Sequence, residues 1–201
     1  MKSITLLIID ESGSMGGMED FVQETYHGIV KEMVTELDEM PDLQQFLEVW
    51  TFEGRNINQR IPFMEISKDL VPTDLRYEPM GNTPLYDAMG RSLTGMKQRM
   101  KSISSLKDAQ VNVCIITDGL ENSSHEFNER RIQRLVSSLK EQDWDFSYYG
   151  TDHEVDYATD SLNVDQAVSF EKGKKGFKEI TNHFNGYSKL KKSMMFNSFK
   201  K

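Results

Sequence analysis

The sequence predicts an α/β protein with a doubly wound, mostly parallel central sheet, one antiparallel edge strand and helices on both faces. Two observations lead to this prediction. Continuous apolar runs, which suit strands covered on both faces, alternate with segments whose apolar residues recur at helical spacing. One pair of strand-like segments is joined by a short turn, so this pair forms an antiparallel hairpin instead of a helical crossover.

The first half of the chain contains a strand, a helix and the hairpin. In chain order we expect a strand at 3–10, a helix near 19–38, and hairpin strands at 46–52 and 57–66. The residues between the two arms, Glu53-Gly54-Arg55-Asn56, read as a four-residue turn. The second arm of the hairpin is expected at the edge of the sheet.

The second half of the chain continues the alternation of helices and strands. In chain order we expect a helix near 84–102, a strand at 111–117, a helix near 126–142, a strand at 145–149, a short helix after Asp152, a short strand at 167–170 and a helix near 174–188. From Lys189 onward the chain is expected to be loose.

The length of the chain and the distribution of its charges indicate how it is organised. With 201 residues, of which 37% are hydrophobic, we expect one domain over residues 1–188 and a basic C-terminal tail over 189–201. Residues 172–201 contain nine Lys and one acid, so the net charge of −8 hides a tail region of +8 and a body of −16. An acidic body argues against nucleic-acid binding.

The basic tail has two interpretations. Its interleaved Lys, Leu, Met and Phe residues are typical of a segment that meets an anionic lipid surface or an acidic partner. The favoured alternative is a last helix that packs on the acidic body of the same chain.

Other features point to a cytoplasmic protein. The sequence has no apolar stretch of transmembrane length, and its start lacks the pattern of a secretory signal. The single cysteine, Cys114, lies in an apolar run, so it excludes an internal disulfide and is expected in the core.

Three loops at expected strand or helix ends carry oxygen-bearing side chains. Asp10, Ser12 and Ser14 follow the first strand, Thr83 precedes a helix, and Asp118 follows the strand at 111–117. Loops after adjacent parallel strands meet at one edge of the sheet, so these oxygens are expected to surround one ion. Oxygen-only ligands favour a hard cation, Mg²⁺ or Mn²⁺.

Each of these residues also has a purely structural interpretation. Asp10 and Ser12 are good turn residues or caps for the helix near 19, and Thr83 before Pro84 is a good helix cap. Asp118-Gly119 is an ordinary turn sequence. The combination of three such loops on an α/β pattern favours the metal site over these interpretations.

At these residues the chain resembles the von Willebrand factor A (VWA) family. Its metal-ion-dependent adhesion site is written Asp-x-Ser-x-Ser, then Thr, then Asp, and Asp10, Ser12, Ser14, Thr83 and Asp118 match it. The settings also match, with Gly-Asn-Thr-Pro-Leu around the threonine and Ile-Thr-Asp-Gly around the last aspartate. The resemblance covers roughly residues 1–185. It implies a Rossmann-like fold, direct coordination by both serines, threonine coordination in the ligand-bound state, and aspartates that bind directly or through water.

The expected function is recognition of another protein. The three hydroxyls are neutral, so a divalent ion held by them and one or two carboxylates keeps uncancelled positive charge and an open position, which an Asp or Glu of a partner can fill. The alternative is a metal-dependent hydrolase or phosphotransferase. Haloacid-dehalogenase-like phosphatases need a second Asp two residues after the first, and here that residue is Ser12. We therefore expect a non-enzymatic, metal-dependent interaction domain.

Overall fold

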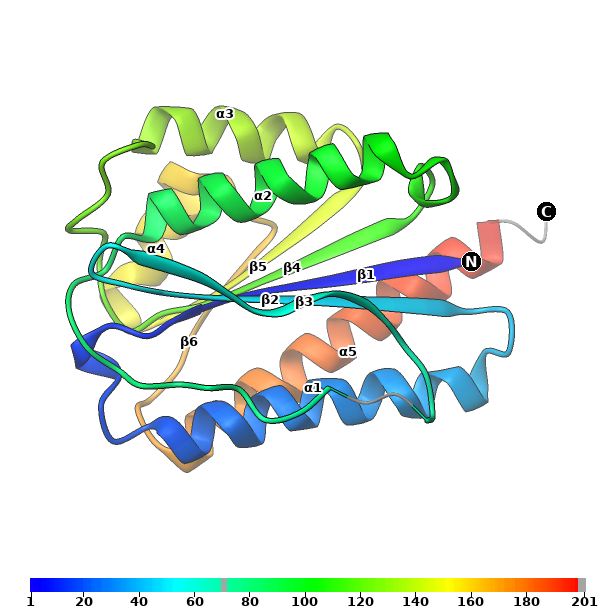
Figure 1. The fold of residues 1–201 in the computed structure, drawn as a ribbon, viewed down its shortest axis with the longest axis horizontal. Helices are drawn as coiled ribbons and strands as arrows, with labels where there is room; N and C mark the ends of the chain where they lie inside the picture. The colour runs from blue at the N-terminus through cyan, green and yellow to red at the C-terminus, as the bar shows by residue number, and fades with distance from the viewer. Residues whose placement is uncertain (70–71, 199–201) are drawn as a thin grey trace.

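A six-stranded sheet forms the middle layer of the protein, with helices on both of its faces (Figure 1). The computed structural model describes residues 1–69 and 72–198, apart from the side chains of 152–154 and 196–198. The strands, in chain order, are β1 (Lys2–Asp10), β2 (Gln44–Glu53), β3 (Asn56–Ile66), β4 (Gln110–Ile116), β5 (Trp144–Gly150) and β6 (Gln166–Ser169). Their order across the sheet is β3-β2-β1-β4-β5-β6.

Only β3 runs antiparallel to its neighbour among the described strands, and it lies at one edge of the sheet. The hairpin turns through Gly54 and Arg55, because Glu53 pairs with Asn56. The predicted fold class, with its hairpin and its antiparallel edge strand, is therefore confirmed.

The helices divide between the two faces of the sheet. They are α1 (Glu19–Glu39), α2 (Leu85–Ser102), α3 (Glu129–Lys140), α4 (Asp152–Leu162) and α5 (Lys174–Ser198), with short 3-10 turns η1 (Gly13–Met15) and η2 (Ser104–Leu106). Helices α2, α3 and α4 cover one face, and α1 and α5 cover the other. Successive residues of β1 alternate between these cores, with Leu6 and Ile8 on the first face and Leu7 and Ile9 on the second. This explains why β1 reads as a continuous apolar run.

Helix α3 begins later than the sequence predicted. The expected helix near 126–142 starts at Glu129, and Asn128 is its N-cap, accepting a hydrogen bond from the Arg131 N–H at 3.1 Å. The preceding residues form a loop because Asp87, on α2, accepts the N–H groups of Glu126 and Phe127 at 2.9 and 2.7 Å. The carboxylate of Asp87 therefore binds the N–H groups of residues that the sequence predicted to form the first turn of the helix.

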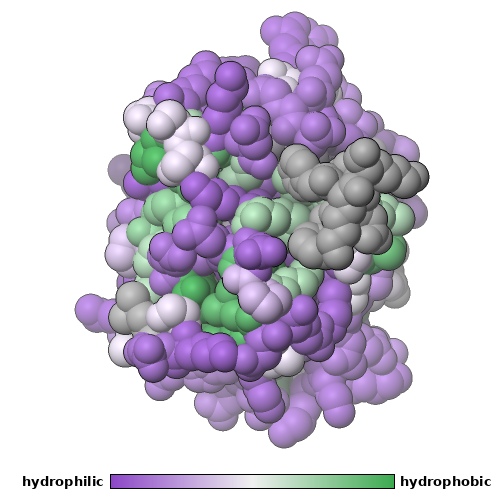
Figure 2. Space-filling view, turned by 90° about the vertical axis from the view of Figure 1, so that its right-hand side faces the viewer, coloured by the Kyte–Doolittle hydropathy of each residue, from purple (hydrophilic) through white to green (hydrophobic). Residues whose placement is uncertain are grey.

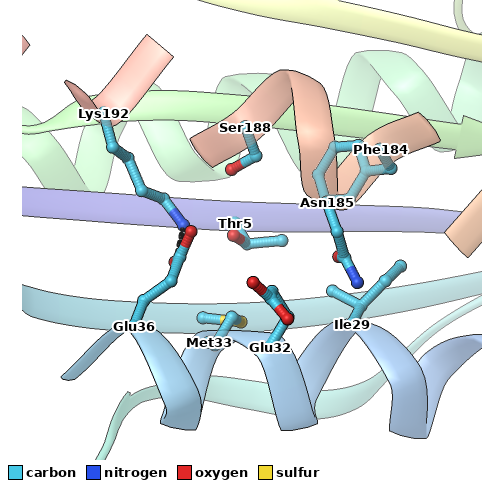
Figure 3. A pocket seen from close by; sticks show the side chains of 9 residues that line it. All are labelled: Thr5, Ile29, Glu32, Met33, Glu36, Phe184, Asn185, Ser188 and Lys192. Atoms are coloured by element: carbon cyan, nitrogen blue, oxygen red, sulfur yellow. Dashed lines mark hydrogen bonds and ion pairs between the residues drawn. The ribbon is translucent and has the colours of Figure 1, made fainter. Parts of the chain in front are cut away.

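The last helix is longer than predicted, and the expectation of a loose end from Lys189 is wrong as far as Ser198. Helix α5 crosses position 188, where the sequence predicted the domain to end and the tail to begin. Lys192 is buried beside Glu36 of α1, at 2.5 Å between Nζ and Oε2 (Figure 3). Lys189 pairs with Glu39 at 2.7 Å and Lys191 with Asp145 at 2.5 Å. The favoured interpretation, packing on the acidic body, is confirmed here; residues 199–201 lie outside the described residues.

The surface at the amino ends of the parallel strands is mainly hydrophilic, with hydrophobic areas near its middle (Figure 2). Cys114 is fully buried in the core, as predicted. None of the helices in the described part of the chain is long and apolar enough to cross a membrane.

Candidate metal centre

The candidate site lies where β1 and β4 end, at the carboxyl edge of the sheet. From β1 the chain leaves through α1 to β2 on one side, while β4 pairs with β1 on the other side. The direction of winding reverses between these two strands. Open α/β sheets bind ligands at such a reversal, because the loops diverge there and leave a crevice.

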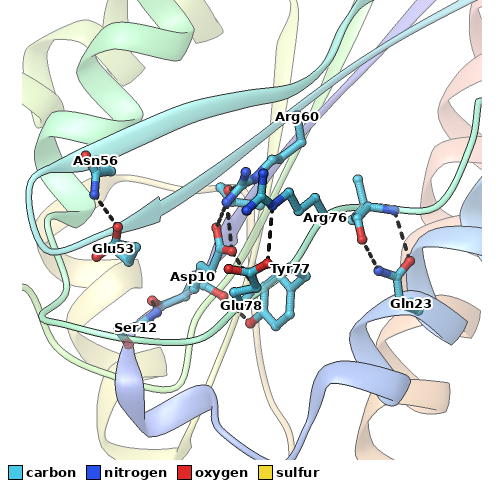
Figure 4. A network of polar contacts seen from close by, with 12 residues as sticks. Asp10, Ser12, Gln23, Glu53, Asn56, Arg60, Arg76, Tyr77 and Glu78 are labelled. Atoms are coloured by element: carbon cyan, nitrogen blue, oxygen red, sulfur yellow. Dashed lines mark hydrogen bonds and ion pairs between the residues drawn. The ribbon is translucent and has the colours of Figure 1, made fainter.

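Asp10, the last residue of β1, is completely buried, and both of its carboxylate oxygens are held. Oδ1 accepts the Ser12 N–H at 2.7 Å, and Oδ2 accepts the Thr117 hydroxyl at 2.6 Å. The Tyr77 hydroxyl donates to the backbone oxygen of Asp10 at 2.5 Å (Figure 4). Burial raises the pKa of Asp10 to about 6, although the hydrogen bonds from Thr117 and Ser12 to its carboxylate oppose this shift. An ionised Asp10 is therefore a costly group that a cation would stabilise.

The other motif residues of the first and third loops touch one another. The Ser12 and Ser14 hydroxyl oxygens are 3.1 Å apart, and the Ser14 hydroxyl donates to Asp118 Oδ1 at 2.6 Å. Ser12 and Asp118 are buried, whereas Ser14 is exposed. These side chains therefore form one cluster that opens to solvent at Ser14.

Thr83 joins the cluster through close contacts between loops. A Cβ added to Gly119 would lie 3.2 Å from the Thr83 hydroxyl oxygen and 3.6 Å from that of Ser14. Gly81, two residues earlier, has a φ of +67° and accepts the Gly13 N–H at 3.1 Å through its backbone oxygen. The structure thus places Thr83 beside Gly119, at the same edge of the sheet as the other four residues that the sequence singled out.

The structural interpretations of these residues are mostly wrong. Thr83 does not cap α2, whose N-cap position is Pro84 without a side-chain hydrogen bond. Met18, not Asp10 or Ser12, precedes α1. Turn formation alone is confirmed, because the Asp10 carboxylate closes a local turn with the Ser12 N–H and the Thr117 hydroxyl accepts the Gly119 N–H at 3.2 Å.

Sequence reasoning missed a buried ion pair beside the site. Glu11 is fully buried, and its oxygens lie 2.8 and 2.7 Å from one terminal nitrogen of Arg60 on β3. Glu11 also accepts the Glu78 N–H at 2.6 Å. The pair fixes the first loop to the edge strand and to the segment before Thr83. A charged residue inside an otherwise apolar and small-residue stretch was the available signal.

A second missed group supports the loop after Asp118. Glu121 accepts the Tyr86 N–H at 2.9 Å, and Asn122 accepts the Thr83 N–H at 2.9 Å. The free N–H groups at the start of α2 are therefore satisfied by the third loop. This contact is between distant segments, and local sequence patterns carry no signal for it.

Lys172 is the third residue that sequence reasoning did not assign to the site. Its Nζ lies 2.5 Å from Asp118 Oδ2 and 3.5 Å from the backbone oxygen of Ser14. The side chain of Asp118 is fully buried, while that of Lys172 is 48% exposed. A cationic group therefore already stands at the carboxylate that the motif assigns to the metal.

The donor set fits a hard divalent cation. The described residues bring together no group of three or more His, Cys, Asp or Glu side chains that could hold a metal ion, so an ion here would need the hydroxyl oxygens as ligands. The cluster offers two carboxylates and three hydroxyls, and Asp118 Oδ2 is buried without accepting a hydrogen bond. Metal binding itself, and the choice of Mg²⁺ or Mn²⁺, stays a prediction.

Comparison with known proteins agrees with this geometry at the level of the fold. No family model and no curated protein matches the sequence. Among solved structures, the SpRpn10 VWA domain aligns with a TM-score of 0.58 and 14% identity, over 90% of this chain and 94% of that one. The fold is VWA-like. The pilus adhesin SpaC from Lactobacillus rhamnosus GG, in an open conformation, aligns with a TM-score of 0.54 and 10% identity.

The two alignments span different shares of the known proteins. The match to SpaC spans 95% of this chain but only 30% of the adhesin, whereas the match to SpRpn10 spans nearly the whole of both chains. At such low identities the comparisons establish the shared VWA-like fold, and the site rests on the residues described above.

Proposed function

We propose that this VWA-like chain is a protein-interaction module. It binds Mg²⁺ or Mn²⁺ through Asp10, Ser12, Ser14, Thr83 and Asp118, and the bound ion recognises an Asp or Glu side chain of a partner protein. The observation that carries the proposal is that these five side chains, from three loops, lie at the carboxyl ends of β1 and β4.

The chemistry of the cluster favours recognition over catalysis. A divalent ion held by two carboxylates and three neutral hydroxyls keeps an accessible position on the side of the exposed Ser14. The ion supplies a positive point charge for an anionic oxygen. The residues supply its position: Thr117 and the Ser12 N–H orient Asp10, and Ser14 orients Asp118. Ser12 stands where a haloacid-dehalogenase-like phosphatase would carry its second aspartate, which disfavours the hydrolase or phosphotransferase alternative.

The first test is thermal unfolding of the metal-stripped protein in Mg²⁺, Mn²⁺ and Ca²⁺. An ion at about 100 times its Kd adds roughly 2.7 kcal/mol of stability and raises the Tm by several degrees. Asp10→Ala should abolish the shift, because it removes a carboxylate from the cluster. Asp160→Ala, which removes an exposed acid from α4, should preserve it and is the matched control. The absence of a shift with every ion would contradict the proposal.

The second test asks whether the ion meets a carboxylate. Water-proton relaxation reports solvent on bound Mn²⁺, and a glutamate peptide that displaces this water should lower it. The same peptide with glutamine should have no effect. Thr83→Ala should retain much of the Mn²⁺ binding and lose the response to the glutamate peptide. Equal loss of Mn²⁺ binding in Asp10→Ala and Thr83→Ala would contradict the assigned roles.

A further inference from the structure

The charge balance at Asp118 differs from that at Asp10. Both oxygens of Asp10 accept hydrogen bonds from neutral groups. Asp118 accepts a hydrogen bond from Ser14 at Oδ1, and its other oxygen, Oδ2, is buried. The Nζ of Lys172 lies 2.5 Å from this Oδ2, so a charged group compensates Asp118 through an ion pair. A buried carboxylate is costly unless polar or charged partners compensate it, and here Ser14 and the half-exposed Lys172 share that role.

The position of Lys172 is fixed from both sides along the chain. Phe170, two residues earlier, is buried, its N–H donates to Gly150 O at 3.0 Å, and its ring packs edge-on against Phe177 of α5. Gly173 follows with a φ of +124°, a conformation that side-chain-bearing residues rarely adopt. Lys172 therefore lies in the short connection between β6 and α5, from which its side chain reaches Asp118.

A divalent ion and the Lys172 ammonium would compete for the same carboxylate. An ion bound by Ser14 and Asp118 has to lie beside the two groups that the ammonium now contacts. Two cations at that separation repel each other in a partly buried site. Because the side chain of Lys172 is 48% exposed, it has a route into solvent that the buried carboxylates lack.

We propose that Lys172 is an internal counter-ion of the site: it neutralises Asp118 in the metal-free protein and is displaced when the divalent ion binds. The inference rests on the proposed metal site and deepens it. It follows that metal affinity is weaker than the five ligands alone would give. The displaced ammonium then lies at the rim of the site, where a partner's carboxylates approach.

Lys174 provides a matched control for Lys172. It belongs to the same segment and carries the same charge, but it is 70% exposed and pairs with Glu24 at 3.2 Å. Substituting either residue by Met changes the net charge equally. Only Lys172→Met removes the ion that competes with the metal.

The decisive experiment measures the Kd for Mn²⁺ by calorimetry in the wild type, Lys172→Met and Lys174→Met. We expect binding to be about tenfold tighter or more in Lys172→Met, which corresponds to about 1.4 kcal/mol, and unchanged in Lys174→Met. Equal Kd values in all three proteins would overturn the role of Lys172 and leave the metal site intact. No binding in any of them would overturn both. A merely structural lysine would lower stability without tightening the Kd.

A second measurement uses the wild type, so it does not depend on the folding of a variant. Reductive methylation followed by mass spectrometry reports how freely each lysine amine reacts. Saturating Mg²⁺ should increase the modification of Lys172 several-fold and leave that of Lys174 unchanged, because only Lys172 loses its carboxylate partner. Equal modification of Lys172 with and without Mg²⁺ would overturn the displacement.

Discussion

Two lysines near the end of the chain meet buried carboxylates, at opposite ends of α5, and their surroundings differ. Lys192 is 3% exposed at its side chain and contacts Glu36 Oε2 at 2.5 Å (Figure 3). Its Nζ also donates to Gln45 Oε1 at 2.9 Å. Gln45 is itself held, donating to Met33 O at 2.6 Å. Lys172 is 48% exposed and faces an open cluster of hydroxyls. The Lys192–Glu36 pair is therefore enclosed by protein, whereas solvent reaches the Lys172–Asp118 pair.

The difference shows that a lysine–carboxylate ion pair can have different roles, depending on how far solvent reaches it. In an enclosed pair, each charge compensates the desolvation cost of the other, and removing one leaves a buried charge without a partner. Such a pair therefore holds α5 against α1. An accessible pair beside further oxygen donors can exchange its cation. We therefore expect the contact between α1 and α5 to be permanent and the Lys172–Asp118 pair to exchange its cation. Four substitutions test this contrast, from the largest expected effect to the smallest.

Lys192→Met should have the largest effect on stability. It leaves Glu36 buried without a cation, and breaking a buried pair in this way costs about 3–5 kcal/mol. Urea unfolding followed by circular dichroism measures the loss, and the double variant with Glu36→Met should recover much of it. A loss below about 1 kcal/mol would show that this region is not fixed by the pair.

Arg60→Met tests whether an enclosed pair at the sheet edge behaves like the pair of Lys192. The side chain of Glu11 is 1% exposed, that of Arg60 is 20% exposed, and Arg60 also donates to Thr51 Oγ1 at 2.8 Å. We expect a loss of about 2–3 kcal/mol in urea unfolding, equal with and without Mg²⁺. If Mg²⁺ restored the lost stability, the Arg60–Glu11 pair would behave like the Lys172–Asp118 pair and not like that of Lys192.

Asp10→Asn should stabilise the metal-stripped protein at pH 7 while abolishing metal binding. The pKa of Asp10 is raised from 3.8 to about 6, so protonation favours the folded state, and this contribution is lost as the pH rises from 3.8 through 6. That difference corresponds to about 3 kcal/mol, and the variant should gain about 1–2 kcal/mol of it. Unfolding of both proteins in EDTA at pH 4, 5.5 and 7 checks whether the gap grows with pH; a constant gap would contradict the cost of the ionised carboxylate.

Lys172→Met should have the smallest effect. Solvent screens its half-exposed ammonium, so we expect the metal-stripped variant to lose about 1 kcal/mol. With saturating Mg²⁺ the loss should disappear, because the divalent ion has already displaced the lysine. The Tm in EDTA and in Mg²⁺ measures both values. A loss of equal size in the two conditions would make this pair as fixed as that of Lys192.

Local sequence patterns determined the parts of this protein in which neighbouring residues decide the structure. The apolar run after Lys2 and the helical spacing of α1 and α2 predicted elements that the structure confirms within one or two residues. The order of strands then brought Asp10 and Asp118 to one edge, as the sequence predicted, and contacts with Asn122 of the third loop hold Thr83 there. Strand ends are determined locally, and parallel strands place their ends together.

The tertiary structure alone decided the contacts between distant segments. Asp87 delayed the start of α3, Arg60 neutralised Glu11, and Lys172 reached Asp118, each across a long stretch of chain. Periodicity and motif spacing carry no information about such pairs, because each depends on which elements pack side by side. The sequence thus identified the side chains of the candidate site, and only the folded chain determined which charges surround them, since a buried charge is compensated by whatever group the packing brings near.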